Sequence, residues 1–303
     1  AAEQLHAEGD QRALSGSQAA LMQRCHRGKA GPFLGLALLL CACSPSPEDE
    51  AASGAQDRRN DIATANFVDR MAGEEQPAPP AKAFQQSEKT GLLEFLYAWP
   101  AEAAAVPAIE AKFRKDMETG RADALKMAEQ DRKSAQQSGF PFHAHSLETH
   151  WTVAADTPRF LSLQSSRYTY TGGAHGMTGY DALLWDKARK RETSIRAVMT
   201  SPAAFVEAIH GRFCDGLDQA RAKKRGGPIM RGDDPFTQCI DPMKEVLVPV
   251  SSSGALIDAI KIVIGPYSAG PYSEGTYEVA LPVDAAMRKA IKTEYQDAFA
   301  GAP

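Results

Sequence analysis

Two short segments of this 303-residue chain concentrate the residue types that could do chemistry. The first, residues 168–176, has the sequence YTYTGGAHG. Two adjacent glycines before a histidine let the backbone approach a ligand closely, so the imidazole is the natural candidate for acid–base catalysis or for ligand contact. No nucleophile or carboxylate motif accompanies it, and a structural histidine that bonds nearby backbone is the alternative. The candidate binding residues here are Tyr168, Tyr170, Gly172, Gly173 and His175.

The second segment, residues 265–275, has the sequence GPYSAGPYSEG and puts Tyr267 and Tyr272 on a constrained loop. Tyrosines on rigid turns suit sugar faces and protein interfaces alike, and they serve equally well as caps of a core between strands. Both segments lie at Gly-rich corners next to predicted strands, where a rigid sheet offers binding residues. We therefore expect the two segments to lie at one end of the folded body and to share a ligand surface.

Other chemistries lack support in the sequence. There is no HExxH, GxSxG or phosphate-cradling glycine loop. His143 and His145 share one face of a predicted strand and His150 lies on the other, so a solvated histidine-rich strand is favoured over a metal site. A net charge of −4, from 34 basic and 38 acidic residues, gives no basic field for nucleic acid. We expect no catalytic residue, no metal and no cofactor. The oligomeric state is left open.

The N-terminal part of the chain has the pattern of an export signal. Three basic residues precede an apolar stretch at 33–40, and the following LCAC at 40–43 resembles a bacterial lipobox. The thiol of Cys43 would then be alkylated by diacylglycerol, anchoring the chain to a membrane through acyl chains. A short buried helix ending in cysteines is the alternative. Ser44 follows, which in this class favours the outer membrane, facing the periplasm, where two membranes are present.

Within this N-terminal part, residues 1–42 are interpreted as the signal region, and 1–21 as an extraneous extension of it. Residues 43–83 are rich in Pro, Ala, Ser and Glu and are expected to form a lipidated, disordered tether.

Cys214 and Cys239 remain once the signal region is removed and Cys43 is lipidated. An even pair in an oxidising compartment indicates a disulfide. It would close a loop whose entropy is worth roughly 3.5 kcal/mol. Two unrelated buried thiols are the alternative. No CxxC is present, so neither thioredoxin-like redox chemistry nor structural zinc is expected.

The folded body is expected to begin near residue 84, with short strands and helices in blocks. This pattern indicates an α+β fold, with two small subdomains of antiparallel sheet and helix. The charge run at 221–225 is interpreted as a solvated helix end. Strands are predicted at 91–99, 141–153, 160–170, 180–185, 245–250, 255–264 and 276–281, and helices at 101–117, 121–138, 203–223 and, capped by Asp284, up to 299.

The two motifs, in this order, resemble the paired extracytoplasmic domains of unknown function found in the anti-sigma factor RsiV and in the N-terminal region of the peptidoglycan deacetylase PdaC. The resemblance implies a PdaC-N-like domain at 84–186 and an RsiV-C-like domain at 187–303. RsiV binds lysozyme, so it further implies a non-catalytic envelope protein that binds a lysozyme-like protein or a peptidoglycan fragment. The alternatives are an envelope hydrolase or deacetylase-related enzyme centred on His175, or a structural accessory of an envelope assembly.

Overall fold

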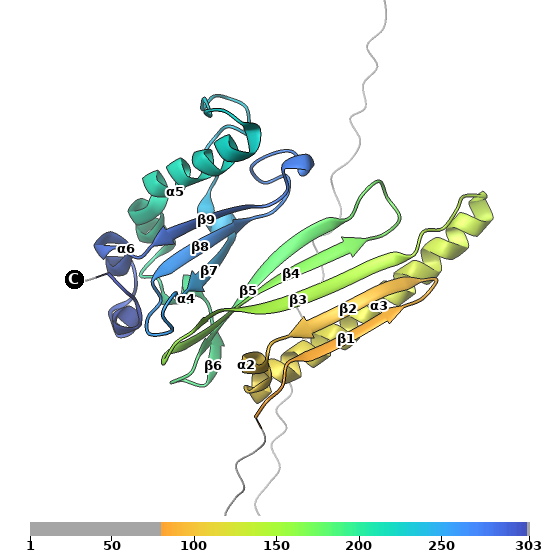
Figure 1. Ribbon diagram of the computed structural model, residues 1–303, viewed down its shortest axis with the longest axis horizontal. Helices are drawn as coiled ribbons and strands as arrows, with labels where there is room; N and C mark the ends of the chain where they lie inside the picture. The colour runs from red at the N-terminus through yellow and green to blue at the C-terminus, as the bar shows by residue number, and fades with distance from the viewer. Residues whose placement is uncertain (1–79, 302–303) are drawn as a thin grey trace, which may run out of the picture. The chain divides into compact units, whose positions relative to one another are not determined.

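A six-stranded sheet and a three-stranded sheet organise the chain in the computed structural model, which describes residues 80–301 (Figure 1). The predicted signal region, the lipidation site Cys43 and nearly all of the predicted tether lie outside the described residues. Among those described, no helix is both long and apolar enough to span a bilayer. Helices and mostly antiparallel strands in separate blocks confirm the predicted α+β class.

The larger sheet has its strands in chain order. They are β1 (Phe84–Lys89), β2 (Leu93–Trp99), β3 (His145–Asp156), β4 (Phe160–Tyr170), β5 (Met177–Asp186) and β6 (Arg191–Thr193). All neighbours pair antiparallel except β2 and β3, which are parallel. A parallel pair requires a crossover connection, and the helices α2 (Ala101–Ala104) and α3 (Pro107–Ser138) provide it.

The first core lies between this sheet and α3, which runs along it (Figure 1). The alternating residues of β2 point inward as predicted, from Leu93 to Trp99. Ile109, Phe113 and Met117 of α3 cover them, and the Phe113 ring stacks on Trp151 of β3 with 4.5 Å between centroids.

The two helices predicted at 101–117 and 121–138 are a single turn, α2, and one long helix, α3. Pro107 starts α3 because proline at the first helical position lacks only an N–H that would be unpaired anyway. Gly120 does not interrupt the helix, since an isolated glycine is tolerated there. Gly139, with φ 73°, ends it in the left-handed conformation. The polar strand β1 was not predicted.

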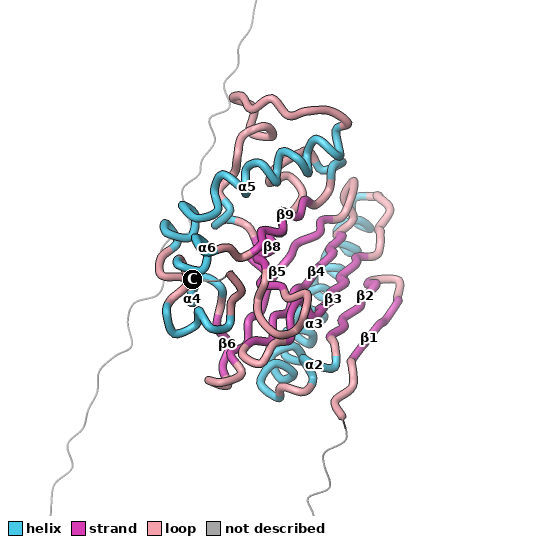
Figure 2. Tube along the Cα trace, turned by 60° about the vertical axis from the view of Figure 1, so that its left-hand side comes forward, coloured by secondary structure: helices cyan, strands magenta, loops and turns pink. Residues whose placement is uncertain are grey.

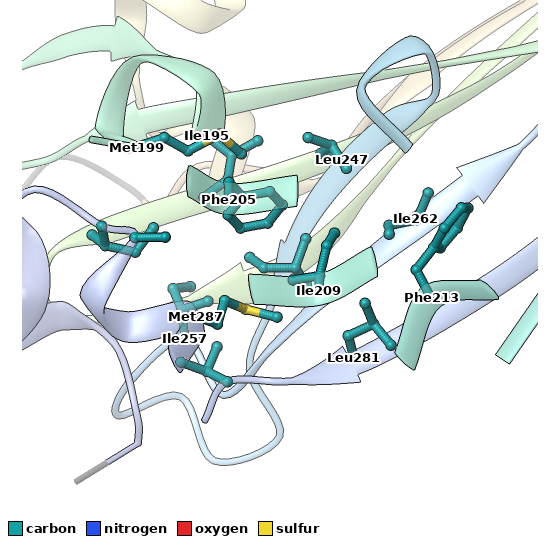
Figure 3. Close-up of a cluster of buried hydrophobic side chains, with 14 of the residues drawn as sticks. Ile195, Met199, Phe205, Ile209, Phe213, Leu247, Ile257, Ile262, Leu281 and Met287 are labelled. Atoms are coloured by element: carbon teal, nitrogen blue, oxygen red, sulfur yellow. The ribbon is translucent and has the colours of Figure 1, made fainter. Parts of the chain in front are cut away.

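The smaller sheet consists of β7 (Val246–Val250), β8 (Ala259–Ile264) and β9 (Tyr277–Pro282), all antiparallel. The helix α5 (Pro202–Arg225) runs along it (Figure 2) and contributes Phe205, Ile209 and Phe213 to the second core (Figure 3). Short helices surround this sheet: α4 (Ile195–Val198), η1 (Pro242–Lys244), η2 (Tyr272–Glu274), α6 (Ala285–Lys289) and η3 (Thr293–Ala298).

The helix predicted to run from Asp284 to 299 is shorter than expected. Asp284 caps α6 as predicted, accepting a hydrogen bond from the Met287 N–H at 2.8 Å. The helix then stops because Ile291 forms an isolated β-bridge with Met199, and the chain resumes as η3. Tertiary pairing overrides local helix propensity here.

The predicted domain boundary at 186/187 stays a prediction. Its surroundings are continuous in the structure, because β6 pairs with β5 across that point. The second core also takes in Phe160 and Leu184 from the larger sheet.

Candidate functional site

The two motifs found in the sequence meet in space. The turn between β4 and β5 carries His175, and the connection between β8 and β9 carries Tyr267 and Tyr272. The His175 ring stacks on the Tyr272 ring with 3.7 Å between centroids and 19° between planes. The Tyr267 ring lies 5.7 Å from that of Tyr272. We refer to His175, Tyr267 and Tyr272 as the aromatic stack.

Hydrogen bonds fix the imidazole in the aromatic stack. Nδ1 of His175 lies 2.9 Å from the carbonyl oxygen of Gly176, and the Tyr272 hydroxyl donates to the same oxygen at 2.8 Å. Because a carbonyl can only accept, Nδ1 carries a hydrogen, and in the neutral ring Nε2 is left as an acceptor. The Tyr267 hydroxyl lies 3.4 Å from Nε2 and donates to it. One backbone carbonyl thus joins the two motifs.

His175 and Tyr267 of the stack are exposed, Tyr272 is half-buried, and the backbone of Tyr267 is strained. His175 is exposed, and Tyr267 is 49% exposed. Tyr267 has φ 70°, in the left-handed region where a bulky side chain is unusual. Such strain costs of order 1–3 kcal/mol and persists only where the surroundings enforce it, which is common at binding sites. Tyr267 is also the more exposed of the two tyrosines of the stack.

Tyr168 supports the turn from beneath. A Cβ placed on buried Gly176 would lie 2.3 Å from Cζ of the Tyr168 ring, so a larger residue here would require that ring to move. Gly172 has φ 90° and turns the chain toward His175. Gly173 is exposed with open space around it.

Tyr170 lies elsewhere. It pairs with Ser146 of β3 and lines a cavity with Gly120 and Met127 of α3. Of the seven candidate binding residues, three therefore form the stack, and Tyr168 and Gly172 shape the turn that carries it.

A charged network holds the second motif in place, and the sequence did not reveal it. Arg225 donates to both carboxylate oxygens of Glu274, at 2.8 and 2.9 Å, and this contact holds the pKa of Glu274 below its usual value. The Tyr277 hydroxyl also bonds to Glu274. Lys224 donates to the Thr276 carbonyl, and burial lowers the pKa of this lysine.

The predicted solvated helix end at 221–225 is confirmed for Lys223 and Lys224, which are exposed, but is wrong for Arg221. Arg221 is fully buried, and its guanidinium donates to the carbonyls of Ala269 and Gln238 at 3.0 and 2.9 Å. Desolvation lowers the pKa of Arg221. Arg221 and Arg225 anchor the Tyr267–Tyr272 loop through Ala269 and Glu274. Their spacing of four along α5 was the available signal, because both residues fall on one helix face.

His143 precedes β3 and does not share a strand face with His145, so that prediction is wrong, whereas His145 and His150 lie on opposite faces of β3 as predicted. His145 is buried, with Nε2 3.1 Å from Asp131 Oδ2, while His143 and His150 are exposed. The prediction of a solvated histidine-rich strand is therefore wrong for His145, which lies on the strand face directed toward α3.

The structure contains a disulfide between Cys214 of α5 and Cys239, with 5.3 Å between the Cα atoms. It ties the helix to the loop at 226–241.

Comparison with known proteins agrees with the domain type that the first motif suggested. Residues 86–178, from β1 through the YTGGAHG turn, match the family model described as deacetylase PdaC. The predicted resemblance is therefore confirmed for this segment, which is similar to the PdaC domain. Among curated proteins, no match is found.

Two solved structures are similar at low identity. A member of the DUF3298 family from Bacteroides fragilis NCTC 9343 is 15% identical, with a TM-score of 0.43 over 71% of this chain and 94% of its own. A DUF3298 family protein from Pseudomonas aeruginosa PAO1 is 16% identical, with a TM-score of 0.41 over 74% of this chain and 99% of its own.

Proposed function

We propose that this protein is a non-catalytic, lipid-anchored envelope protein whose aromatic stack binds a lysozyme-like protein. The observation that carries the proposal is the convergence of His175 and Tyr267, 92 residues apart, into one cluster in which both side chains are exposed and Tyr267 has strained backbone. Exposed tyrosines on rigid supports are typical of the few residues that dominate protein interfaces.

The contacts of the imidazole favour binding over catalysis. Among the described residues, its two nitrogens contact the Gly176 carbonyl and the Tyr267 hydroxyl. A catalytic histidine of a hydrolase is oriented by a carboxylate or equivalent group and activates a nucleophile. Here the ring is oriented by backbone and stacked against Tyr272, an arrangement that presents a surface rather than a proton relay.

A peptidoglycan fragment is the second candidate ligand. The half-exposed ring of Tyr267 offers an apolar face with a polar hydroxyl, the combination on which sugars stack. A glycan arm therefore belongs in the same experiment.

The test is a binding titration of the protein against lysozyme and, separately, against purified muropeptides. Tyr267→Ala should weaken binding by at least about tenfold, because loss of a hot-spot side chain costs ~2 kcal/mol or more. Phe140→Ala is the matched control, since Phe140 is an aromatic residue 72% exposed at the end of α3. Equal binding by the two variants would contradict the proposal, as would absence of binding to both ligands.

The lipid anchor has its own test. Cys43→Ala should leave the signal uncleaved or release the protein from the membrane fraction, because no thiol is left to be alkylated. Normal membrane partitioning of this variant would refute the anchor without touching the binding surface.

A further inference from the structure

A second cluster, separate from the aromatic stack, surrounds the disulfide. His210 and Cys214 lie one turn apart on α5, a spacing of four that puts them on the same helix face. Cys239 comes from the loop that follows the helix. The imidazole nitrogen and the two sulfurs all lie within 4.8 Å of one another. Cys214 is buried, Cys239 is half-buried and His210 is exposed, so the cluster opens to the surface.

The distances suit a tetrahedral thiolate–imidazole metal site. With Zn–S near ~2.3 Å and Zn–N near ~2.0–2.1 Å, two ligand atoms at the tetrahedral angle lie about 3.6 Å apart. Nε2 of His210 is 3.6 Å from Sγ of Cys214. The two sulfurs must separate, to about 3.8 Å on the same geometry, and Sγ of Cys239 already lies within 4.8 Å of a His210 nitrogen. Cys239 belongs to a loop rather than to a helix or strand, so this movement leaves α5 in place.

We propose that reduction of the Cys214–Cys239 disulfide converts this cluster into a site for a thiophilic divalent cation of the Zn²⁺ type. A dithiol supplies two electrons and two protons to the cystine and becomes a disulfide itself. The cation then displaces one proton from each new thiol, and both protons pass to solvent. His210 supplies the third ligand, and the fourth position faces the groove that His210 lines with Glu207 and Asp241.

The two sulfurs can therefore either form the disulfide or bind the metal, but not both at once. Soft thiolate donors select cations of this class over Mg²⁺ or Ca²⁺. The sequence did not predict this group of ligands. The two cysteines are 25 residues apart, and His210 lies near Cys214 only because the segment between them is helical.

The test is a titration with Co²⁺ of the full chain carrying Cys25→Ser, Cys41→Ser and Cys43→Ser, so that Cys214 and Cys239 are its only cysteines. It is made before and after reduction by a phosphine and is followed by absorption spectroscopy and Zn²⁺ competition. Reduced protein should bind a single equivalent with a thiolate-to-cobalt charge-transfer band, and oxidised protein should not. His210→Ala should weaken the affinity at least about tenfold while leaving circular dichroism unchanged, because the residue is exposed. His150→Ala removes another exposed imidazole, from β3, and should have no effect.

Several outcomes would overturn the proposal. These are a reduced protein without the charge-transfer band, an equal affinity in the His210→Ala variant, or equal binding by the oxidised form. If reduction lowers the circular dichroism signal, Zn²⁺ should restore it, because binding free energy is then coupled to folding. Failure to restore it would also count against the site.

Discussion

Helix α5 approaches β9 closely because residue 216 is glycine. A Cβ at Gly216 would lie 2.7 Å from Cγ1 of Val279, well inside van der Waals contact. Val279 is buried and β-branched, so it has little freedom to turn aside. Gly211, one and a half turns earlier on the same helix, is exposed, and a Cβ there would meet nothing within 4 Å.

Alanine should therefore be stabilising at position 211 but not at position 216. Each substitution gains about 1 kcal/mol of helix propensity. Gly216→Ala also overpacks the contact with β9, which costs about 1–3 kcal/mol. We expect Gly211→Ala to raise the free energy of unfolding by about 1 kcal/mol. The free energy of unfolding of the Gly216→Ala variant should be about 1–3 kcal/mol lower than that of the Gly211→Ala variant. In a domain of this size, each kcal/mol of this difference corresponds to about 2–4 °C in Tm.

The assay is urea denaturation followed by far-ultraviolet circular dichroism, with equal m-values required for all variants. Adding Val279→Ala should remove most of the penalty of Gly216→Ala and leave the effect of Gly211→Ala unchanged. The reasoning would be refuted if Gly216→Ala stabilised the protein as much as Gly211→Ala does.

Three further predictions concern the site and its supports. Gly176→Ala should weaken ligand binding because the added Cβ overlaps the Tyr168 ring, whereas the Gly173→Ala variant should bind normally in the same titration. Glu274→Gln should be less stable than the wild type at neutral pH. The gap should close in acid, because a depressed pKa contributes stability above the usual value of 4.5 that is lost as pH falls through the folded value; a gap independent of pH would contradict this. Reducing the Cys214–Cys239 disulfide should lower the free energy of unfolding by roughly 3.5 kcal/mol. If mass spectrometry of the unreduced protein finds both thiols free, the disulfide is refuted.

Periodicity was sufficient for the strongly amphipathic elements. The alternation of β2 and the stripe of α5 were both predicted, because each buries one continuous apolar face. The elements missed are polar or depend on distant partners. β1 has no fully buried residue, and the end of α6 is set by a bridge between Ile291 and Met199.

The candidate site divides along the same line. Residue types and glycine spacing identified His175, Tyr267 and Tyr272, because each lies in a glycine-rich segment next to a predicted strand. The support of the site was not predictable locally. Arg225 and Glu274 are 49 residues apart, and a basic run at a helix end ordinarily faces solvent. Only the fold brings Arg221 under the loop at Ala269.

The long helix α3 is covered very unevenly, and this has a consequence for local opening. Its buried side chains are Ile109, Phe113 and Met117 in the first third and Ala128 further on, whereas residues 129–138 are almost entirely exposed. Helix ends without tertiary cover open at little free-energy cost. Amide hydrogens of the last turns should therefore exchange with solvent far sooner than those near Phe113. That end of α3 is where the domain can accept insertions or a fused reporter without disturbing either core.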